Sequence, residues 1–117
     1  MNNTRQNKVS RQIQKDISDI FQKEMNALAH GSMLSVTVVR VSPDLENARV
    51  YISVFPSEKS AEVIHAVQES AKTIRHLLAQ RIKNQVRKIP ELIFQIDDSL
   101  DYVEKIEKLL APKTIDN

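Results

Sequence analysis

The 117-residue sequence contains no cysteine, which excludes disulfides, thiolate metal sites and a cysteine nucleophile. It also contains a single glycine, so it has no glycine-rich loop of the kind that cradles phosphate groups. No apolar run approaches the roughly 20 residues of a membrane-spanning helix, and the polar N-terminus lacks the apolar stretch of a signal peptide. The composition, 41% hydrophobic and 27% charged, is that of a globular protein. We therefore expect a cytoplasmic protein that does not enter the membrane.

Aromatic residues are scarce, since the chain has three phenylalanines, two tyrosines and no tryptophan. Phe21, Phe55 and Phe94 fall in apolar patterns that predict core positions, which leaves Tyr51 and Tyr102 as exposed candidates. RNA-binding sheets that stack bases use paired, exposed aromatic side chains. Recognition of stacked bases on a sheet is therefore not predicted.

The sequence offers little for catalysis. His30, His65 and His76 do not have the spacing of metal ligands, and no cysteine supports them. Asp97 and Asp98 could form a metal or acid–base pair, as in a small nuclease. Neighbouring side chains of a strand point to opposite faces, however, and acidic residues commonly cap helices, so capping is the favoured interpretation. We expect no enzymatic activity, no metal and no cofactor.

Hydrophobic periodicity predicts an α+β fold. The first expected elements are a helix over residues 6–29, ended by the left-handed residue Gly31, and two strands over residues 33–41 and 48–55. A helical run should follow from an N-cap at Ser57 to residue 88, with a bend at Ser70, Ala71 and Lys72. A strand over residues 92–96 and a short helix around residues 102–110 complete the expected order. The first two strands should pair antiparallel, and the third, after a helical crossover, can run parallel to one of them. This order predicts a three-stranded sheet with helices on one face, in a single domain over residues 1–111 followed by a tail, 112–117.

Residues 72–88 contain six cations and one histidine but no acidic residue, although the net charge of the whole chain is only +2. On a helix, Ala71, Ile74, Leu78 and Ile82 would form an apolar stripe. The cations would occupy the remaining surface: Lys72, Arg75, Arg81, Lys83, Arg87 and Lys88. Because the segment has no acid to pair with them, it predicts an uncompensated basic surface that binds a polyanion, most commonly a phosphate backbone. The alternative is a solvated helix face.

A second basic cluster precedes the first acidic residue, Asp16. It consists of Arg5, Lys8, Arg11 and Lys15, and it either extends the same surface or is an ordinary polar helix start. Arg40 and Arg49 are further candidates on the predicted hairpin. The chain is polarised, with 14 basic and 8 acidic residues in 1–88 against 3 and 7 in 89–117. Such asymmetry is typical of nucleic-acid contact, or of a protein whose ends complement each other.

The order of the predicted elements and several strings resemble the ribosome-binding factor A family of bacterial small-subunit assembly proteins, over roughly residues 5–110. The strings are Val36-Thr37, Val41-Ser42-Pro43-Asp44-Leu45 and Val50-Tyr51 in the hairpin, then Ile74-Arg75, Leu78, Arg87, Pro90-Glu91-Leu92, Phe94 and Asp97-Asp98-Ser99. No single string is diagnostic of the family, but their joint order and spacing are.

The resemblance implies a type II KH-like fold, helix–strand–strand–helix–kink–helix–strand, in which a kink with an Ala-any-Gly signature replaces the glycine loop of ordinary KH domains. It also implies binding to the immature small ribosomal subunit through its rRNA, near the decoding region and the 3′ end. The family aids late maturation and precursor rRNA processing there, especially in the cold, without catalysing a reaction. In this sequence the kink position reads Ser70, Ala71, Lys72 and therefore lacks the glycine. The usual Asp-Pro-Arg before the first strand is replaced by residues 29–32.

The sequence thus predicts a monomeric, non-enzymatic factor of ribosome biogenesis whose partner is the small ribosomal subunit and its rRNA. The six cations of residues 72–88 are the first candidates for phosphate contacts, and Arg5, Lys8 and Arg11 are the second. Ser70 and Ala71 would shape the bend. The alternative is a protein-interaction module that docks a basic helix on an acidic partner.

Overall fold

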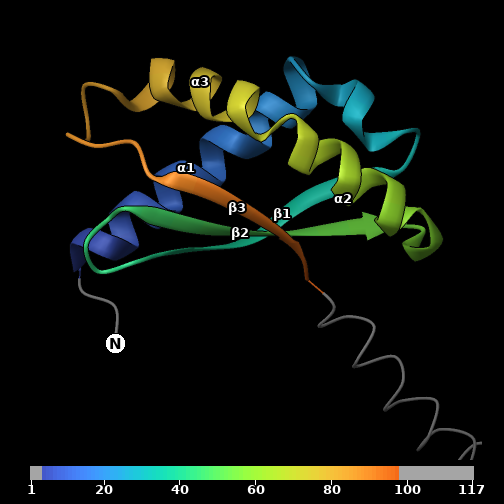
Figure 1. Cartoon of the computed structure of the whole chain (residues 1–117), viewed down its shortest axis with the longest axis horizontal. Helices are drawn as coiled ribbons and strands as arrows, with labels where there is room; N and C mark the ends of the chain where they lie inside the picture. The colour runs from blue at the N-terminus through green and yellow to red at the C-terminus, as the bar shows by residue number, and fades with distance from the viewer. Residues whose placement is uncertain (1–3, 98–117) are drawn as a thin grey trace, which may run out of the picture.

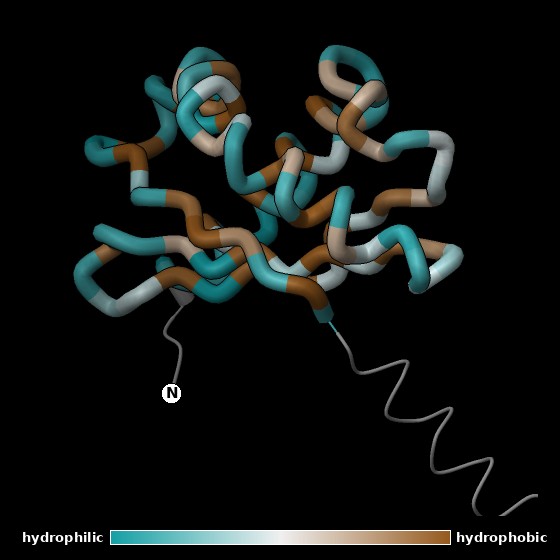
Figure 2. Tube along the Cα trace, turned by 45° about the vertical axis from the view of Figure 1, so that its right-hand side comes forward, coloured by the Kyte–Doolittle hydropathy of each residue, from teal (hydrophilic) through white to brown (hydrophobic). Residues whose placement is uncertain are grey.

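The computed structural model describes residues 4–97 (Figure 1). Its elements are α1 (Thr4–Lys23), the 3-10 helix η1 (Asn26–Ala29), β1 (Met33–Val41), β2 (Asn47–Phe55), the 3-10 helix η2 (Ser57–Lys59), α2 (Ser60–Glu69), α3 (Ala71–Ile82) and β3 (Glu91–Ile96). Within these residues the helices cover one face of the sheet, as predicted, and form a separate layer above it (Figures 1 and 2). The predicted helix around residues 102–110 lies outside the described part of the chain.

The sheet of the described residues has the strand order β1–β2–β3, with β2 in the centre. β1 and β2 form the predicted antiparallel hairpin, and β3 runs parallel to β2 after the helical crossover. The pairing of β1 is irregular between Val36 and Val38, which places the bulge at Thr37. Because a bulge adds one residue to the alternation, Val36 and Val39 are buried while Val38 is only half-buried. The bulge therefore explains why the apolar residues of β1 do not alternate regularly in the sequence.

The core lies between the helices and the sheet. Its large, fully buried apolar side chains come from four elements that the hydrophobic pattern identified: Ile13, Ile17 and Ile20 of α1, Val50 and Ile52 of β2, Val63 and Val67 of α2, and Ile74, Leu78 and Ile82 of α3. Phe21 and Phe94 are buried as predicted, and their ring centroids lie 6.4 Å apart. The prediction for Phe55 is wrong, because this last residue of β2 lies on the exposed face of the sheet.

The first helix is shorter than predicted. It ends at Lys23, where the backbone N–H groups of Glu24 and Met25 both donate to the carbonyl of Ile20 at 2.9 Å, and the chain continues as η1. The left-handed conformation expected at Gly31 is confirmed, with φ 79°, but His30 before it is also left-handed, with φ 51°. This tight turn brings the chain from η1 into β1.

The helical run after β2 differs from the prediction at both ends. Ser57 is not an N-cap, since it begins η2 and α2 starts three residues later. The bend is confirmed at the predicted place: Ser70, with φ −95° and ψ 7°, separates α2 from α3. α3 then ends at Ile82 rather than at residue 88, and residues 83–90 turn back toward β3. As a result Lys83, Arg87 and Lys88 do not share one helix with Lys72.

Candidate nucleic-acid interface

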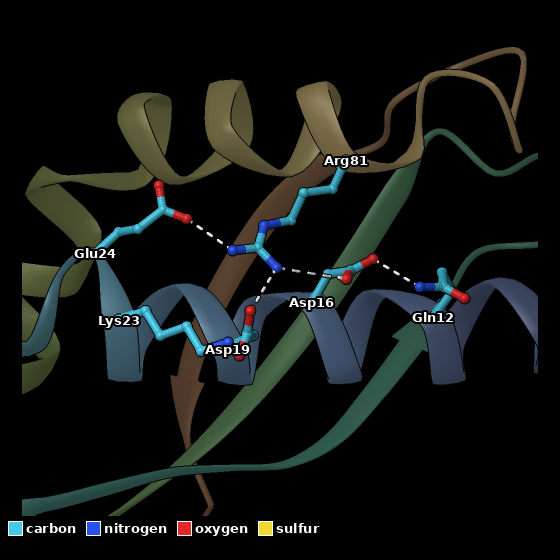
Figure 3. A network of polar contacts seen from close by, with 6 residues as sticks. All are labelled: Gln12, Asp16, Asp19, Lys23, Glu24 and Arg81. Carbon is cyan, nitrogen blue, oxygen red and sulfur yellow. Dashed lines mark hydrogen bonds and ion pairs between the residues drawn. The ribbon is translucent and has the colours of Figure 1, made fainter.

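Arg81 is the best-paired cation of the basic segment (Figure 3). It extends from the last turn of α3, and its guanidinium donates to Asp19 Oδ2 of α1 and to Oε2 of Glu24, the residue after α1, each at 2.7 Å. A third carboxylate, that of Asp16, has an oxygen 3.8 Å from Nη1. These partners lie far away in the sequence, so the prediction that residues 72–88 form an uncompensated surface is wrong for Arg81.

The acidic partners of Arg81 are held by further contacts on α1. Gln12 Nε2 donates to Asp16 Oδ2 at 2.7 Å, and Lys23 Nζ lies 3.2 Å from Asp19 Oδ1. The hydrogen bond from Arg81, and next that from Lys23, lower the pKa of the Asp19 carboxyl below its usual value. The hydrogen bonds to Glu24 and Asp19 in turn raise the pKa of Arg81. This cluster, which we call the Arg81 network, ties α3 to α1.

Arg75 and Lys88 also have partners within the protein. Arg75 donates from Nη2 to the carbonyl of Ile89 at 2.6 Å and from Nε to that of Pro90 at 3.0 Å. Lys88 Nζ donates to Glu46 Oε2 at 2.9 Å, which joins the segment before β3 to the hairpin turn. These two cations fix the path of residues 83–90 and are only partly available to an external anion.

The remaining predicted cations have no such partner within residues 4–97. Their side chains are exposed and take part in no ion pair or hydrogen bond among the described residues: Lys72, Lys83 and Arg87 from the first group, and Arg5, Lys8 and Arg11 from the second. The sequence therefore identified a basic region correctly but could not separate its paired cations from its open ones.

Two of the open cations line a groove between α3 and the segment that leads into β3. This α3 groove has a volume of about 660 Å³ and is lined by Lys72, Arg75, His76, Arg87, Lys88 and Glu91, among others. Lys72 enters it from the first turn of α3, directly after the bend at Ser70, where the helix dipole is positive. Arg87 enters it from the turn after the helix. The groove thus offers two open cations from separate elements, with Glu91 as its single acidic residue.

Three of the four residues of the second basic cluster line another groove, between α1 and the end of α3, and Arg5 does not line it. This α1 groove has a volume of about 460 Å³. Lys8, Arg11 and Lys15 line it from α1, while Ile82 and Val86 belong to its apolar wall. The open cations therefore lie in two separate grooves, with Lys72 and Arg87 in one and Lys8, Arg11 and Lys15 in the other, and Lys83 lines neither of them.

Arg40 and Arg49 lie on the hairpin, on the sheet face that the described helices leave open. They are paired across β1 and β2, and both are exposed. A surface hollow of about 440 Å³ includes both arginines together with Tyr51 and Ile93. These cations are separated from the α3 groove by the thickness of the sheet.

The residues considered for catalysis are not brought together within the described chain. Asp97 Oδ2 accepts a hydrogen bond of 2.6 Å from Thr37 Oγ1, and Asp98 lies outside the described residues. His30 contacts Glu62 at 3.4 Å and His65 contacts Glu69 at 3.2 Å, on the surface. Residues 4–97 contain no group of three or more side chains suited to hold a metal ion. Among the helices of the same residues, none has the length and apolar character needed to cross a membrane.

The helix–strand–strand–helix–bend–helix–strand order, with β3 parallel to a central β2, defines a type II KH-like α+β protein, here with two basic grooves. The family model described as "Ribosome-binding factor A" matches residues 5–110, and the chain belongs to this family. The protein of that name from Flavobacterium psychrophilum is 46% identical over 114 residues, which are 97% of this chain and 88% of the relative. The family predicted from the sequence is therefore confirmed.

Solved structures agree with the fold. The crystal structure of ribosome-binding factor A from Thermus thermophilus superposes with a TM-score of 0.65 at 22% identity, covering 78% of this chain and 94% of that one. A homology model of the Thermus thermophilus protein, fitted into a cryo-EM map of its 30S complex, gives a TM-score of 0.61 at 24% identity and covers 76% and 91% of the two chains. Both likenesses confirm the predicted KH-like fold.

Proposed function

We propose that this protein is a ribosome assembly factor that binds the immature small ribosomal subunit through its rRNA. Residues 1–111 form its single RNA-binding domain, residues 112–117 form a tail, and it works as a monomer in the cytoplasm. The observation that carries the proposal is the α3 groove, where Lys72 and Arg87 converge from two elements without a carboxylate partner in the described residues. Membership of the family and the 30S complex of the Thermus relative support the same partner.

The open cations make the phosphate contacts in this proposal. Lys72 combines its ammonium with the positive end of the α3 dipole, an arrangement that favours a phosphate at the bend. Arg87 contacts a neighbouring phosphate from across the groove, since its guanidinium can bind two phosphate oxygens at once. Lys83 adds a further positive charge beyond the end of the helix. Arg75, Arg81 and Lys88 act mainly by holding α1, α3 and β3 in the arrangement that forms the groove.

Lys8 and Arg11 of the α1 groove supply a second contact, together with Arg5 of the same helix. Two separated basic surfaces fit a folded rRNA better than a single strand, because they can bind two backbones that are adjacent only in the particle. Binding of this kind aids late maturation and precursor rRNA processing by stabilising one rRNA arrangement, and it requires no chemical step by the protein. The apolar wall of the α1 groove suits the alternative function as well, docking on an acidic protein partner.

The test is co-sedimentation with purified immature small subunits. The double variant Lys72→Glu with Arg87→Glu should bind at least about tenfold more weakly, because two phosphate contacts become repulsive. The matched control is Arg40→Glu with Arg49→Glu, which makes the same change in charge on the open face of the sheet and should bind as the wild type does. Equal weakening in both variants would show that net charge, and not the α3 groove, governs binding. Unchanged sedimentation of the first variant would overturn the assignment of the groove.

A further inference from the structure

The three histidines of the chain differ in their partners. His30 Nδ1 lies 3.4 Å from Glu62 Oε2. His65 Nε2 lies 3.2 Å from Glu69 Oε2, one turn further along α2. His76 has no carboxylate partner within residues 4–97. A histidine side chain ordinarily becomes charged below about pH 6.5. A proton on His76 would therefore be a positive charge without a counterion in the described part of the protein.

His76 lies in the α3 groove. Its side chain is exposed and lines this groove together with those of Lys72 and Arg87. Lys72 precedes His76 by four residues on α3, so the two side chains lie on the same side of the helix. Arg87 comes from the turn after the helix. The imidazole thus belongs to the same surface as the two open cations.

The charged groups around His76 are almost all positive. Those that line the groove with it are Lys72, Arg75, Arg87, Lys88 and Glu91. The single acidic residue, Glu91, has its Oε1 4.0 Å from Arg75 Nη1 and forms no ion pair with His76. A phosphate between these groups would attract a further positive charge on the imidazole. Protonation of His76 and binding of a phosphate in the groove therefore favour each other.

The ring nitrogens of His76 allow both contacts at once. Gln80 Nε2 lies 3.2 Å from His76 Nε2, one turn further along α3. A glutamine amide donates through its nitrogen and accepts through its oxygen, so Gln80 can satisfy this ring nitrogen in either protonation state. The other ring nitrogen, Nδ1, has no partner among residues 4–97. Because a protonated imidazole donates from both nitrogens, His76 can keep Gln80 and donate to a phosphate oxygen as well.

We propose that His76 is a third phosphate-binding residue of the α3 groove, beside Lys72 and Arg87, and that it binds phosphate in its protonated form. Binding of the polyanion then takes up a proton, and it strengthens as the pH falls through the range in which histidine titrates. This inference rests on the proposed binding of rRNA in the α3 groove. It adds the residue that makes this binding depend on pH near neutrality.

The test is co-sedimentation with immature small subunits at pH 6 and at pH 8, at constant ionic strength. The wild type should bind about fivefold more tightly at pH 6, as when one charged contact to a phosphate is gained. His76→Gln should lose most of this gain, since glutamine does not titrate. His76→Lys should bind at pH 8 about as tightly as the wild type does at pH 6, because lysine is charged at both values.

His65→Gln is the matched control, because it removes an exposed histidine that does not line the α3 groove. It should keep the pH dependence of the wild type. Since the subunit also titrates, each variant is compared with the wild type at the same pH. A gain at pH 6 that is equal in the wild type and in His76→Gln overturns the proposal.

A second measurement does not require the subunit. Proton NMR resolves the ring signals of the three histidines, and the loss of one signal in His76→Gln assigns that residue. When polyphosphate is added, the titration midpoint of the His76 signal should move to higher pH by at least about half a pH unit, and more than that of His65. A midpoint that polyphosphate does not move overturns the proposal. Wild-type protein that binds no subunits at either pH, yet shows this movement, would refute the proposed function and leave the assignment of His76 in place.

Discussion

Arg81 in the last turn of α3 donates a 2.7 Å hydrogen bond to Asp19 of α1, a residue 62 positions earlier in the chain. The bond belongs to a network that also includes Glu24 and Asp16 (Figure 3). Its position assigns Arg81 a structural role within a segment whose Lys72, Lys83 and Arg87 are exposed and have no partner among residues 4–97. Cations that are paired within the protein thus alternate with open cations in the basic region, and substitutions can distinguish the two kinds.

Arg81→Met should lower the free energy of unfolding by about 1–2 kcal/mol. The substitution keeps much of the aliphatic stem but leaves three neighbouring carboxylates without their common partner, one of them the buried Asp16. The measurement is urea unfolding followed by circular dichroism. Lys83→Met is the control, because Lys83 lies two residues after Arg81, carries the same charge, and is exposed without a partner in residues 4–97. This substitution should lower the free energy of unfolding by less than about 0.5 kcal/mol. Equal destabilisation by both variants would refute the structural role of the Arg81 network.

The same network predicts a dependence of stability on pH. The pKa of Asp19 is lowered in the folded protein from its ordinary value of 3.8, so the unfolded chain binds a proton there more readily. The contribution of Asp19 is therefore complete above pH 3.8 and is lost as the pH falls through the lower folded pKa. The hydrogen bond from Ser42, and then the backbone N–H of Glu46, lower the pKa of Asp44 in the hairpin turn, with the same sign of effect.

Urea unfolding at pH 6 and at successive values below pH 4 measures this effect. Asp19→Asn should be less stable than the wild type at pH 6, and the difference should shrink as the solution is made acidic, because protonation removes the same charge from the wild type. A difference that stays constant over the whole range would contradict the lowered pKa. Added salt should reduce the difference at pH 6, since the network is partly exposed to solvent.

Local patterns in the sequence were sufficient for most of the fold. The alternation of Val50, Ile52 and Val54 identified β2, and the stripe from Ile74 to Ile82 identified the buried side of α3. The end of α3 could not be predicted, because no glycine or proline lies between Ile82 and Pro90 and Val86 continues the helical spacing. What turns the chain is a tertiary contact, the pair of hydrogen bonds from Arg75 to the carbonyls of Ile89 and Pro90.

The candidate site was predictable as a region but not as a set of free side chains. Residues 72–88 contain no acidic residue, and the sequence alone shows this. The partners that neutralise Arg81 and Lys88 come from α1 and from the hairpin turn, 62 and 42 positions away in the sequence. A variant that combines Arg81→Glu with Lys83→Glu would therefore damage the fold together with any binding surface. Only Lys72, Lys83 and Arg87 remain as clean probes of that segment.

The salt dependence of subunit binding should reveal how many phosphates each groove binds. Removing one cation that binds a phosphate is expected to reduce the slope of log K against log salt by roughly 0.7–0.9. Lys72→Ala with Arg87→Ala should therefore reduce the slope by roughly 1.4–1.8, and Lys8→Ala with Arg11→Ala should reduce it by a similar amount if the α1 groove binds rRNA. The measurement is a filter-binding titration at several salt concentrations. A slope that is unchanged in the Lys8 and Arg11 variant, with weaker binding to an acidic protein instead, would assign the α1 groove to a protein partner.

The resemblance to the family implies that Lys72 stands where the kink signature has glycine, and we expect Lys72 to act through its charge rather than through the shape of the bend. The bend itself is already formed at Ser70, and Lys72 lies within α3. Lys72→Gly and Lys72→Ala both remove the ammonium, but only glycine frees the backbone for a close approach to rRNA. We expect both variants to bind immature small subunits about five- to tenfold more weakly and to the same degree, as when one charged group that binds a phosphate is removed. Binding by the glycine variant as strong as that of the wild type, with weak binding by the alanine variant, would instead show that lysine at this position substitutes for a backbone contact.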